Sequence, residues 1–167
     1  MSIITRLSDA LVRLAEWLTI CSLGAIAIIV PWEVFSRYIF DSMAVWSSEF
    51  CQYCLVCASM MGAAAGLRKG YQVGITTVMD KLTDVQAEIL QGIVFGIVIV
   101  FCAIMTWYSA LQMAANWMQT SSTMGISMSI PYASMPLGFA IMTVVTLAQL
   151  AELRAGRRQV QAAVGGV

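Results

Sequence analysis

The sequence of 167 residues contains no histidine. This absence removes the imidazole group, which is a common ligand of haem and zinc and the usual general base of catalytic triads. Bis-histidine haem ligation, histidine-dependent triads and most zinc sites are therefore excluded. The sequence as a whole predicts no catalytic, cofactor-binding or metal-binding residue, and a protein that is not an enzyme.

Charged residues are also scarce, at 11% of the chain, whereas hydrophobic residues make up 60%. Because a soluble domain has about 25% charged residues, this deficit is typical of a membrane protein. There are only three prolines, and no Pro/Ser-rich linker separates a second domain. We predict an all-α fold, with a single four-helix transmembrane domain over residues 1–153 and a flexible cytoplasmic tail over residues 154–167.

Four apolar stretches are long enough, with their flanking residues, to cross the hydrocarbon core, which takes about 20 helical residues. They run from about Trp17 to Tyr38, from Phe50 to Leu67, from Ile89 to Met113 and from Met135 to Leu150. The first stretch has the charged start of a signal peptide but lacks a convincing small-residue cleavage site. We interpret it as a retained first span.

Residues at the ends of these stretches are typical of helix ends. Glu49 lies in the first turn of the second stretch, where the helix dipole favours an acid. Arg68 and Gly70 follow its last turn, as is common after a helix. Pro131 and Pro136 lie at the start of the fourth stretch, where proline is best tolerated.

Lysine and arginine are distributed unevenly between the connections. Eight of the nine precede the first stretch, lie between the second and third, or follow the fourth, and only Arg37 lies in the other two connections. Positive residues favour the cytoplasmic side of a membrane. We therefore predict a multi-pass protein of a bacterial inner membrane, with both termini and the middle connection in the cytoplasm.

The middle connection contains a further periodic pattern. Its apolar residues are Ile75, Val78, Met79 and Leu82. This helical spacing predicts a short amphipathic helix lying in the inner membrane interface. An ordinary loop with chance periodicity is the alternative.

Glu33 and Arg37 lie four residues apart near the outer end of the first span, with the acid first, which is the favourable order for a helical ion pair. Ionisable groups at membrane depth are costly and often functional, so Glu33 could carry a proton or a cation. Alternatively, the two side chains neutralise each other or form a salt bridge with a partner subunit. The neighbouring Trp32, a residue type typical of membrane interfaces, favours the structural interpretation.

Cys51, Cys54 and Cys57 form a CxxCxxC pattern near the outer end of the second span. A CxxC motif that faces the oxidising side is also found in membrane proteins that generate disulfides, but these need a second outward cysteine pair to pass oxidation on. The outer connection over residues 116–131 has no cysteine. The spacing also places the three small side chains on one helix face, where they permit close packing.

Small-xxx-small motifs occur on two spans, as Gly62-x-x-x-Gly66 and Gly92-x-x-x-Gly96. They favour close helix contact, either within the chain or with another subunit. No span carries a line of polar residues across its depth, although a protein that moves a solute alone needs such a track or a broken helix. The sequence therefore favours a supporting subunit of a transporter.

Several runs of residues also occur in a characteristic order. They are Val34–Phe40, Trp46–Glu49, Gly62–Gly70, Thr123–Ile126, Ile130–Tyr132 and Met135–Gly138. Together they make the chain between Ala15 and Leu150 resemble the small membrane subunit (DctQ type) of tripartite ATP-independent periplasmic, or TRAP, transporters. The candidate structural or partner-contacting residues are Glu33, Arg37, Trp46, Glu49, Gly62, Gly66, Arg68, Gly70, Pro131, Tyr132, Pro136 and Gly138.

The resemblance implies a small, scaffold-supporting subunit of a sodium-driven importer of small organic anions or related solutes. A periplasmic binding protein would deliver the solute to a large membrane subunit, which would carry the substrate and sodium sites. Membrane lipids would be further partners, and nucleic acid would not. The family often has a histidine and an aspartate where this chain has Gln72 and Thr76, so a role of that connection that needs ionisable groups is in doubt.

Two other functions remain as alternatives. One is a stand-alone, proton-coupled exporter of the small multidrug type that uses Glu33, although this residue is predicted near the outer end of its span. The other is a membrane disulfide oxidase that uses the cysteine pattern, although the second cysteine pair is missing.

Overall fold

The computed structural model describes residues 3–39, 45–68 and 84–164. The helices in this part of the chain are α1 (Ile3–Ile39), α2 (Val45–Arg68), α4 (Asp84–Ala115), α5 (Ser129–Tyr132) and α6 (Ser134–Val164). Four of them, α1, α2, α4 and α6, are long and apolar enough to cross a membrane, which confirms the predicted spans and the all-α class.

Two predictions concern the connection after α2 and the end of α6. The predicted interfacial helix over residues 75–82 lies outside the described residues, as do Gly70, Gln72 and Thr76. Helix α6 continues beyond Leu153 as far as Val164. The division of the chain into a domain and a flexible tail at residue 154 therefore stays a prediction.

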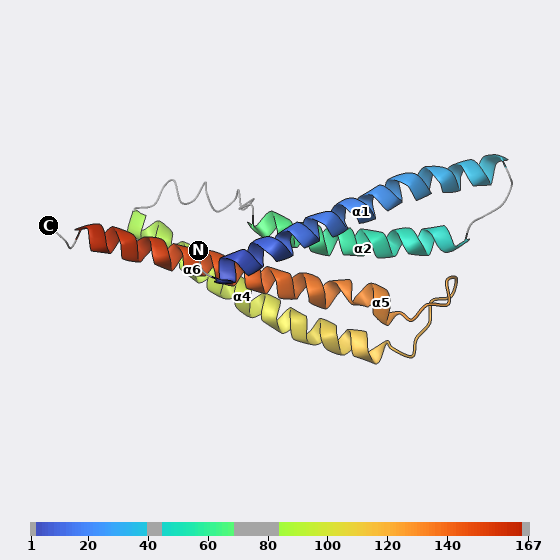
Figure 1. Ribbon diagram of the computed structural model, residues 1–167. Coiled ribbons are helices and arrows are strands. Elements are labelled where there is room, and N and C mark those ends of the chain that lie inside the picture. Colours follow the sequence, from blue (N-terminus) through green and yellow to red (C-terminus); the bar gives the residue numbers. More distant parts are fainter. Residues whose placement is uncertain (1–2, 40–44, 69–83, 165–167) are drawn as a thin grey trace.

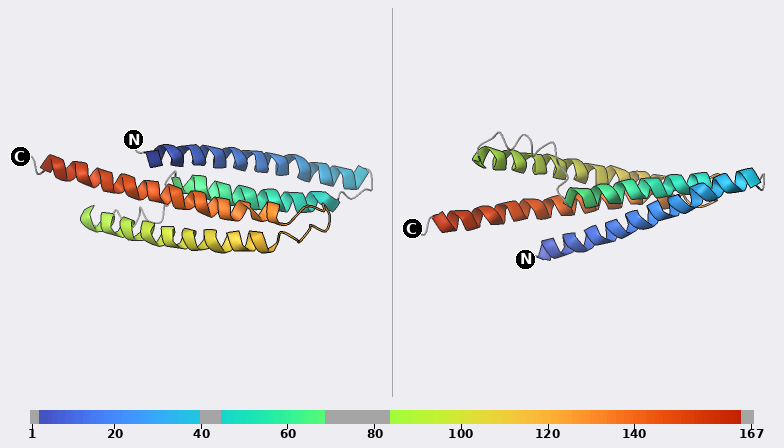
Figure 2. Two further views of the ribbon diagram at one scale, coloured as in Figure 1. Left: turned by 60° about the horizontal axis from the view of Figure 1, so that its bottom comes forward. Right: turned by 90° about the horizontal axis from the view of Figure 1, so that it is seen from above.

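The four long helices form an open layer in the order α1, α2, α6, α4. Helices α2 and α6 lie side by side in the middle, while α1 packs on α2 and also crosses α6, and α4 packs on α6 and α5 (Figures 1 and 2). Burial follows this order, because 33% of the most apolar stretch of α6 is buried and 0% of that of α1. The two flanking helices therefore leave most of their apolar surface for lipid or for other subunits.

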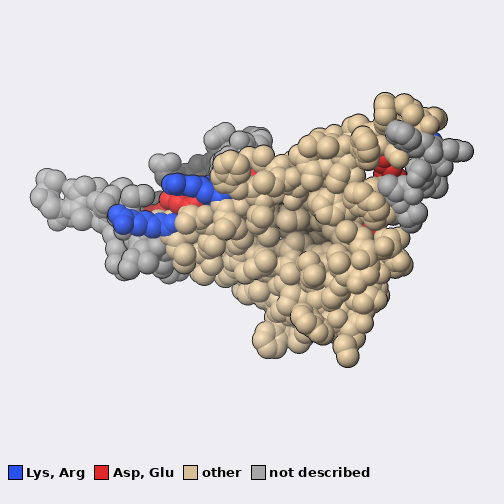
Figure 3. All heavy atoms as spheres, turned by 45° about the vertical axis from the view of Figure 1, so that its right-hand side comes forward, with Lys and Arg blue, Asp and Glu red and all other residues tan. Residues whose placement is uncertain are grey.

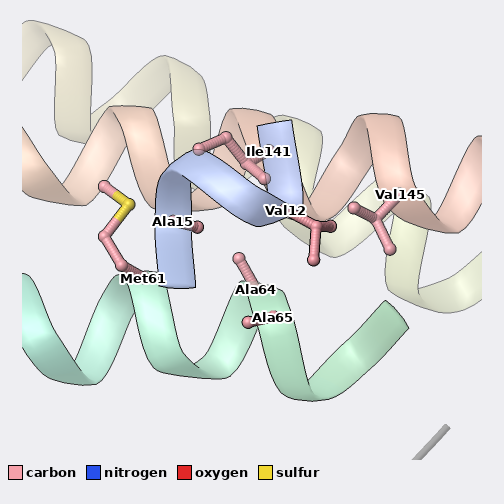
Figure 4. Close-up of a cluster of buried hydrophobic side chains, with 7 residues drawn as sticks. All are labelled: Val12, Ala15, Met61, Ala64, Ala65, Ile141 and Val145. Atoms are coloured by element: carbon pink, nitrogen blue, oxygen red, sulfur yellow. The ribbon is translucent and has the colours of Figure 1, made fainter. Parts of the chain in front are cut away.

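The buried core lies where α1 crosses the central pair. It is built from Val12 and Ala15 of α1, Met61, Ala64 and Ala65 of α2, and Ile141 and Val145 of α6 (Figure 4). Three of these seven side chains are alanine, whose small size lets helix backbones approach closely. The core is close to Arg68, the last residue of α2, and far from the other end of the layer. We call these two ends the arginine end and, after the connection over residues 116–128, the loop end.

Gly138 permits a close approach between α6 and Met60 of α2. A Cβ atom at this position would lie 2.9 Å from the Cβ atom of Met60, closer than side chains tolerate. At Gly62 a Cβ atom would make ordinary contact with Thr19, at 3.6 Å. At Gly66 and Gly92, as at Gly96, it would meet no atom within 4 Å. Of the glycines in the two small-xxx-small motifs, only Gly62 therefore approaches a neighbouring helix within the described structure.

We expect Gly138→Ala to lower the free energy of unfolding by about 1–3 kcal/mol, because α2 and α6 must move apart to admit the methyl group. Gly92→Ala is the matched control and should change stability by less than about 1 kcal/mol, since open space surrounds that position. Both can be measured as denaturant or thermal unfolding in a mild detergent. Equal effects of the two substitutions would contradict the close approach.

Candidate functional site

In the part of the chain that the structure describes, charged residues lie toward the two ends of the layer. Residues 17–32, 50–67, 89–115 and 134–151, which make up most of the four spans, contain no Asp, Glu, Lys or Arg. The face drawn in Figure 3 accordingly shows blue and red atoms toward the ends and a broad uncharged band between them. Among the described spans there is thus no charged group at mid-depth that could replace the hydration of an ionic solute.

At the loop end, the carboxylate of Glu49 holds the connection between α4 and α5. It accepts hydrogen bonds from the hydroxyl groups of Ser121 and Thr123, and from that of Ser122 at 3.1 Å. A carboxylate has several acceptor sites and can receive all three donors. Two segments that are 72 or more residues apart in the sequence are thereby joined.

The connection itself is folded into a tight turn. The amide of Ser121 donates to the carbonyl of Ile126 at 2.8 Å, and the amide of Met128 donates to that of Gln119 at 2.8 Å. Between them Gly125 has a φ of +66°, a conformation that glycine adopts without steric cost. The turn therefore presents its serine and threonine hydroxyl groups to the start of α2.

A pocket of about 270 Å³ opens beside this carboxylate. It is lined by Glu49, Gln52, Tyr53, Val56, Met128, Pro131, Tyr132 and Met135. The hydroxyl of Tyr53 donates to the sulfur of Met128 at 3.5 Å across one side. We call this the loop-end pocket. Three of the candidate residues from the sequence, Glu49, Pro131 and Tyr132, thus line one cavity.

At the arginine end, Arg68 connects three helices. Its guanidinium group forms ion pairs with Asp9 of α1 and Glu152 of α6, each at 3.0 Å. Beside it the amide of Gln149 donates to the backbone carbonyl of Leu67 at 2.8 Å, which satisfies an acceptor at the end of α2. Planar guanidinium groups suit such contacts because they offer several donors in fixed directions.

The sequence alone identified Arg68 but not its partners. Asp9, Gln149 and Glu152 could have been found from the predicted topology, which places the start of the first span and the end of the fourth on the same side as Arg68. The hydrogen bonds of Glu49 could not be predicted in this way, because the fold of the connection over residues 116–128 was not predicted.

Among the described residues, Glu33 and Arg37 form no ion pair with each other, and the alternative of a salt bridge with a partner subunit stays a prediction. Glu33 is half-buried and Arg37 is exposed, and both ion pairs among the described residues belong to Arg68. An exposed pair on a helix gains little energy in water, so the side chains have no strong reason to meet.

The remaining candidates serve packing or lie apart from the pocket. Trp46 is 46% exposed at the start of α2 and makes an edge-to-face contact with Phe50. Pro136 and Gly138 lie in the first turns of α6, just after the pocket-lining Met135. Cys51, Cys54 and Cys57, like the other two cysteines, are free thiols.

These features define a multi-pass membrane protein whose helices are joined by polar contacts at both ends and carry no charged track. The family profile described as the DctQ component of tripartite ATP-independent periplasmic transporters matches residues 26–156. The chain belongs to this family of small permease subunits, which are transport components and not enzymes.

Curated relatives agree with this assignment. The chain is 23% identical over 132 residues to the sialic acid TRAP transporter small permease protein SiaQ of Vibrio cholerae, covering 78% of this chain and 75% of that protein. It is 22% identical over 152 residues to the C4-dicarboxylate TRAP transporter small permease protein DctQ of the same species, covering 77% of this chain and 66% of that protein. Neither the exporter nor the disulfide oxidase is favoured by these findings.

We expect Arg68→Gln to lower the free energy of unfolding by about 1–2 kcal/mol, because it breaks both ion pairs that join α1 and α6 to α2. The effect is modest because the side chains of Asp9 and Glu152 are 35% and 45% exposed and solvent therefore screens both ion pairs. Unfolding in mild detergent at low salt measures the effect, and high salt should reduce it.

The matched control for this prediction is Arg13→Gln. Arg13 is an exposed cation on α1, so its loss removes a positive charge from the same end without breaking either ion pair of Arg68. Equal stability of the two variants would show that the three-helix contact contributes nothing measurable.

Proposed function

We propose that this chain is the scaffold-supporting small subunit of a sodium-driven TRAP transporter that imports a small organic anion or a related solute. The observation that supports this most directly is the uncharged middle of all four spans. Moving an ion through hydrocarbon without compensating contacts costs at least several kcal/mol. The sodium and substrate sites are therefore assigned to a large membrane subunit, and solute capture to a periplasmic binding protein.

The class of solute is proposed from the two named relatives. One is named for sialic acid and the other for C4-dicarboxylates, and both solutes are small organic anions. Nothing in the described pockets of this chain selects between such anions, since the loop-end pocket carries a carboxylate that would repel them. The choice of solute belongs to the other subunits.

The orientation is proposed from the positions of the cations. Arg6 and Arg13 lie near the start of α1, and Arg68 is the last residue of α2, so all three belong to the same end of the layer (Figure 1). Arg37 lies at the opposite end, in the last turn of α1. The positive-inside rule therefore supports a cytoplasmic arginine end and a periplasmic loop end.

Reporter fusions test this orientation. Alkaline phosphatase, which is active only in the periplasm, should be active when fused after Ser122 and inactive when fused at the C-terminus. A fluorescent protein that folds only in the cytoplasm should give the opposite pattern. Phosphatase activity at the C-terminus would overturn the proposed arrangement.

Reconstitution tests the supporting role. In liposomes with an inward sodium gradient, this chain alone should give no solute uptake above protein-free vesicles. Uptake should appear when the large membrane subunit and the binding protein are both supplied, and a sodium ionophore should abolish it. Saturable uptake by this chain alone would show that it carries its own translocation site.

A further inference from the structure

The loop-end pocket has the chemistry of a site for a cationic side chain. Glu49, Gln52, Tyr53 and Tyr132 are among the residues that line it, so its lining includes an acidic, an amide and two aromatic residues. Carboxylates and aromatic rings both attract guanidinium and ammonium groups. Its volume of about 270 Å³ is below the range of about 300–1,000 Å³ that is typical of pockets for small-molecule ligands, so it suits a single side chain.

The chain offers few cations for this site. Between residues 33 and 49 the sequence contains three acids, Glu33, Asp41 and Glu49, but only one cation, Arg37. Arg37 is exposed at the end of α1 and does not line the pocket. The carboxylate of Glu49 forms no ion pair with any described residue, because both ion pairs in that part of the chain belong to Arg68. Among the described residues at the loop end, two acids, Glu33 and Glu49, accompany one cation, Arg37, and this excess of negative charge is one that a basic partner would balance.

An exposed strip of α2 continues from this pocket along the span. Its residues are Ser48, Gln52, Leu55, Ser59 and Ala63, all of which are exposed. Most of these side chains are small or polar, and the amide of Gln52 forms no hydrogen bond with any described residue. Hydrocarbon offers no hydrogen-bonding partner to such a group, whereas a neighbouring helix does.

The exposed strip of α4 has the opposite character. Most exposed residues of α4 are large and apolar, among them Ile93, Ile97, Val100, Ile104 and Leu111. Such a surface is fully compatible with lipid chains. The contrast between the two helices indicates that α2 is covered by protein and that α4 faces lipid.

We propose that a transmembrane helix of the large subunit packs along the exposed strip of α2 and places an arginine or lysine side chain in the loop-end pocket beside Glu49. The inference rests on the proposed function, because it assigns an interface to the partner that this function requires. Two observations support this helix as the occupant. The pocket contains an acidic residue that a cation would complement, and the strip of α2 that continues from it consists mostly of small or polar side chains.

Photo-crosslinking in the complex with the large subunit tests the interface. Benzoylphenylalanine is placed at Gln52 or Ser59 on α2, with Ile97 on α4 as the matched control, since all three positions are exposed. We expect adducts with the large subunit from positions 52 and 59, and adducts with lipid from position 97. Adducts with phospholipid alone from position 52 would overturn the proposal and assign the strip to the bilayer.

Substitutions test whether a cationic side chain of the large subunit occupies the loop-end pocket. Val56→Trp should fill the pocket and reduce the amount of large subunit retained in mild detergent by about tenfold or more, whereas Ile97→Trp on the lipid-facing strip should leave it unchanged. Glu49→Gln should reduce retention and also its sensitivity to salt. Thr123→Val is the control for loop effects, because it removes one hydroxyl donor to Glu49 and keeps the charge.

The outcomes separate the interface from the function. If the unaltered chain retains no large subunit, the proposed function is wrong. If it retains the large subunit but Val56→Trp and Ile97→Trp behave alike, only the assignment of the α2 strip is wrong. If Thr123→Val reproduces the effect of Glu49→Gln, the carboxylate acts through the loop, and the cationic side chain is rejected.

Discussion

The structure depends on one constraint, which is that polar groups inside a bilayer must find their partners within protein. Helices satisfy this for the backbone, and the charged side chains of the described residues lie toward the two ends of the layer. At one end, the ion pairs of Arg68 join α1 and α6 to α2. At the other end, Glu49 accepts hydrogen bonds from the connection before α5. Between these ends the helices are held by close packing of small residues, such as Gly138 against Met60.

The same constraint explains what the sequence could predict. Long apolar runs and scarce charge are strong signals, so the four spans were predicted with the correct type and order, although the helices extend beyond them, as α6 does to Val164. The packing of the helices was harder to predict, because small residues favour close contact but do not specify which helix they contact. The motif Gly62-x-x-x-Gly66 was predicted to favour close contact, and Gly138 was singled out only by the family resemblance. Of these three glycines, only Gly138 lies so close to a neighbouring helix that a Cβ atom would clash.

The candidate site residues also differ in how far the sequence could predict their role. The runs that contain Glu49, Pro131 and Tyr132 were singled out by their resemblance to a family, and they line one pocket in the structure. The role of Glu49 could not be predicted from the sequence, because it depends on a turn that contains Gly125, in a connection without helical periodicity. The spacing of Glu33 and Arg37 permits an ion pair but supplies little energy to form one, and the described residues show none between these two side chains. A salt bridge of either residue with a partner subunit stays a prediction.

The open arrangement of the helices has a consequence for how the protein sits among lipids. A closed bundle of four helices presents a compact outline to the bilayer, whereas a layer in the order α1, α2, α6, α4 presents a long edge (Figure 2). A long edge gives each flanking helix two open sides, so the layer borders more lipid or more neighbouring protein than a closed bundle of the same four helices would. The boundary of the protein in the membrane plane is therefore long for its number of residues.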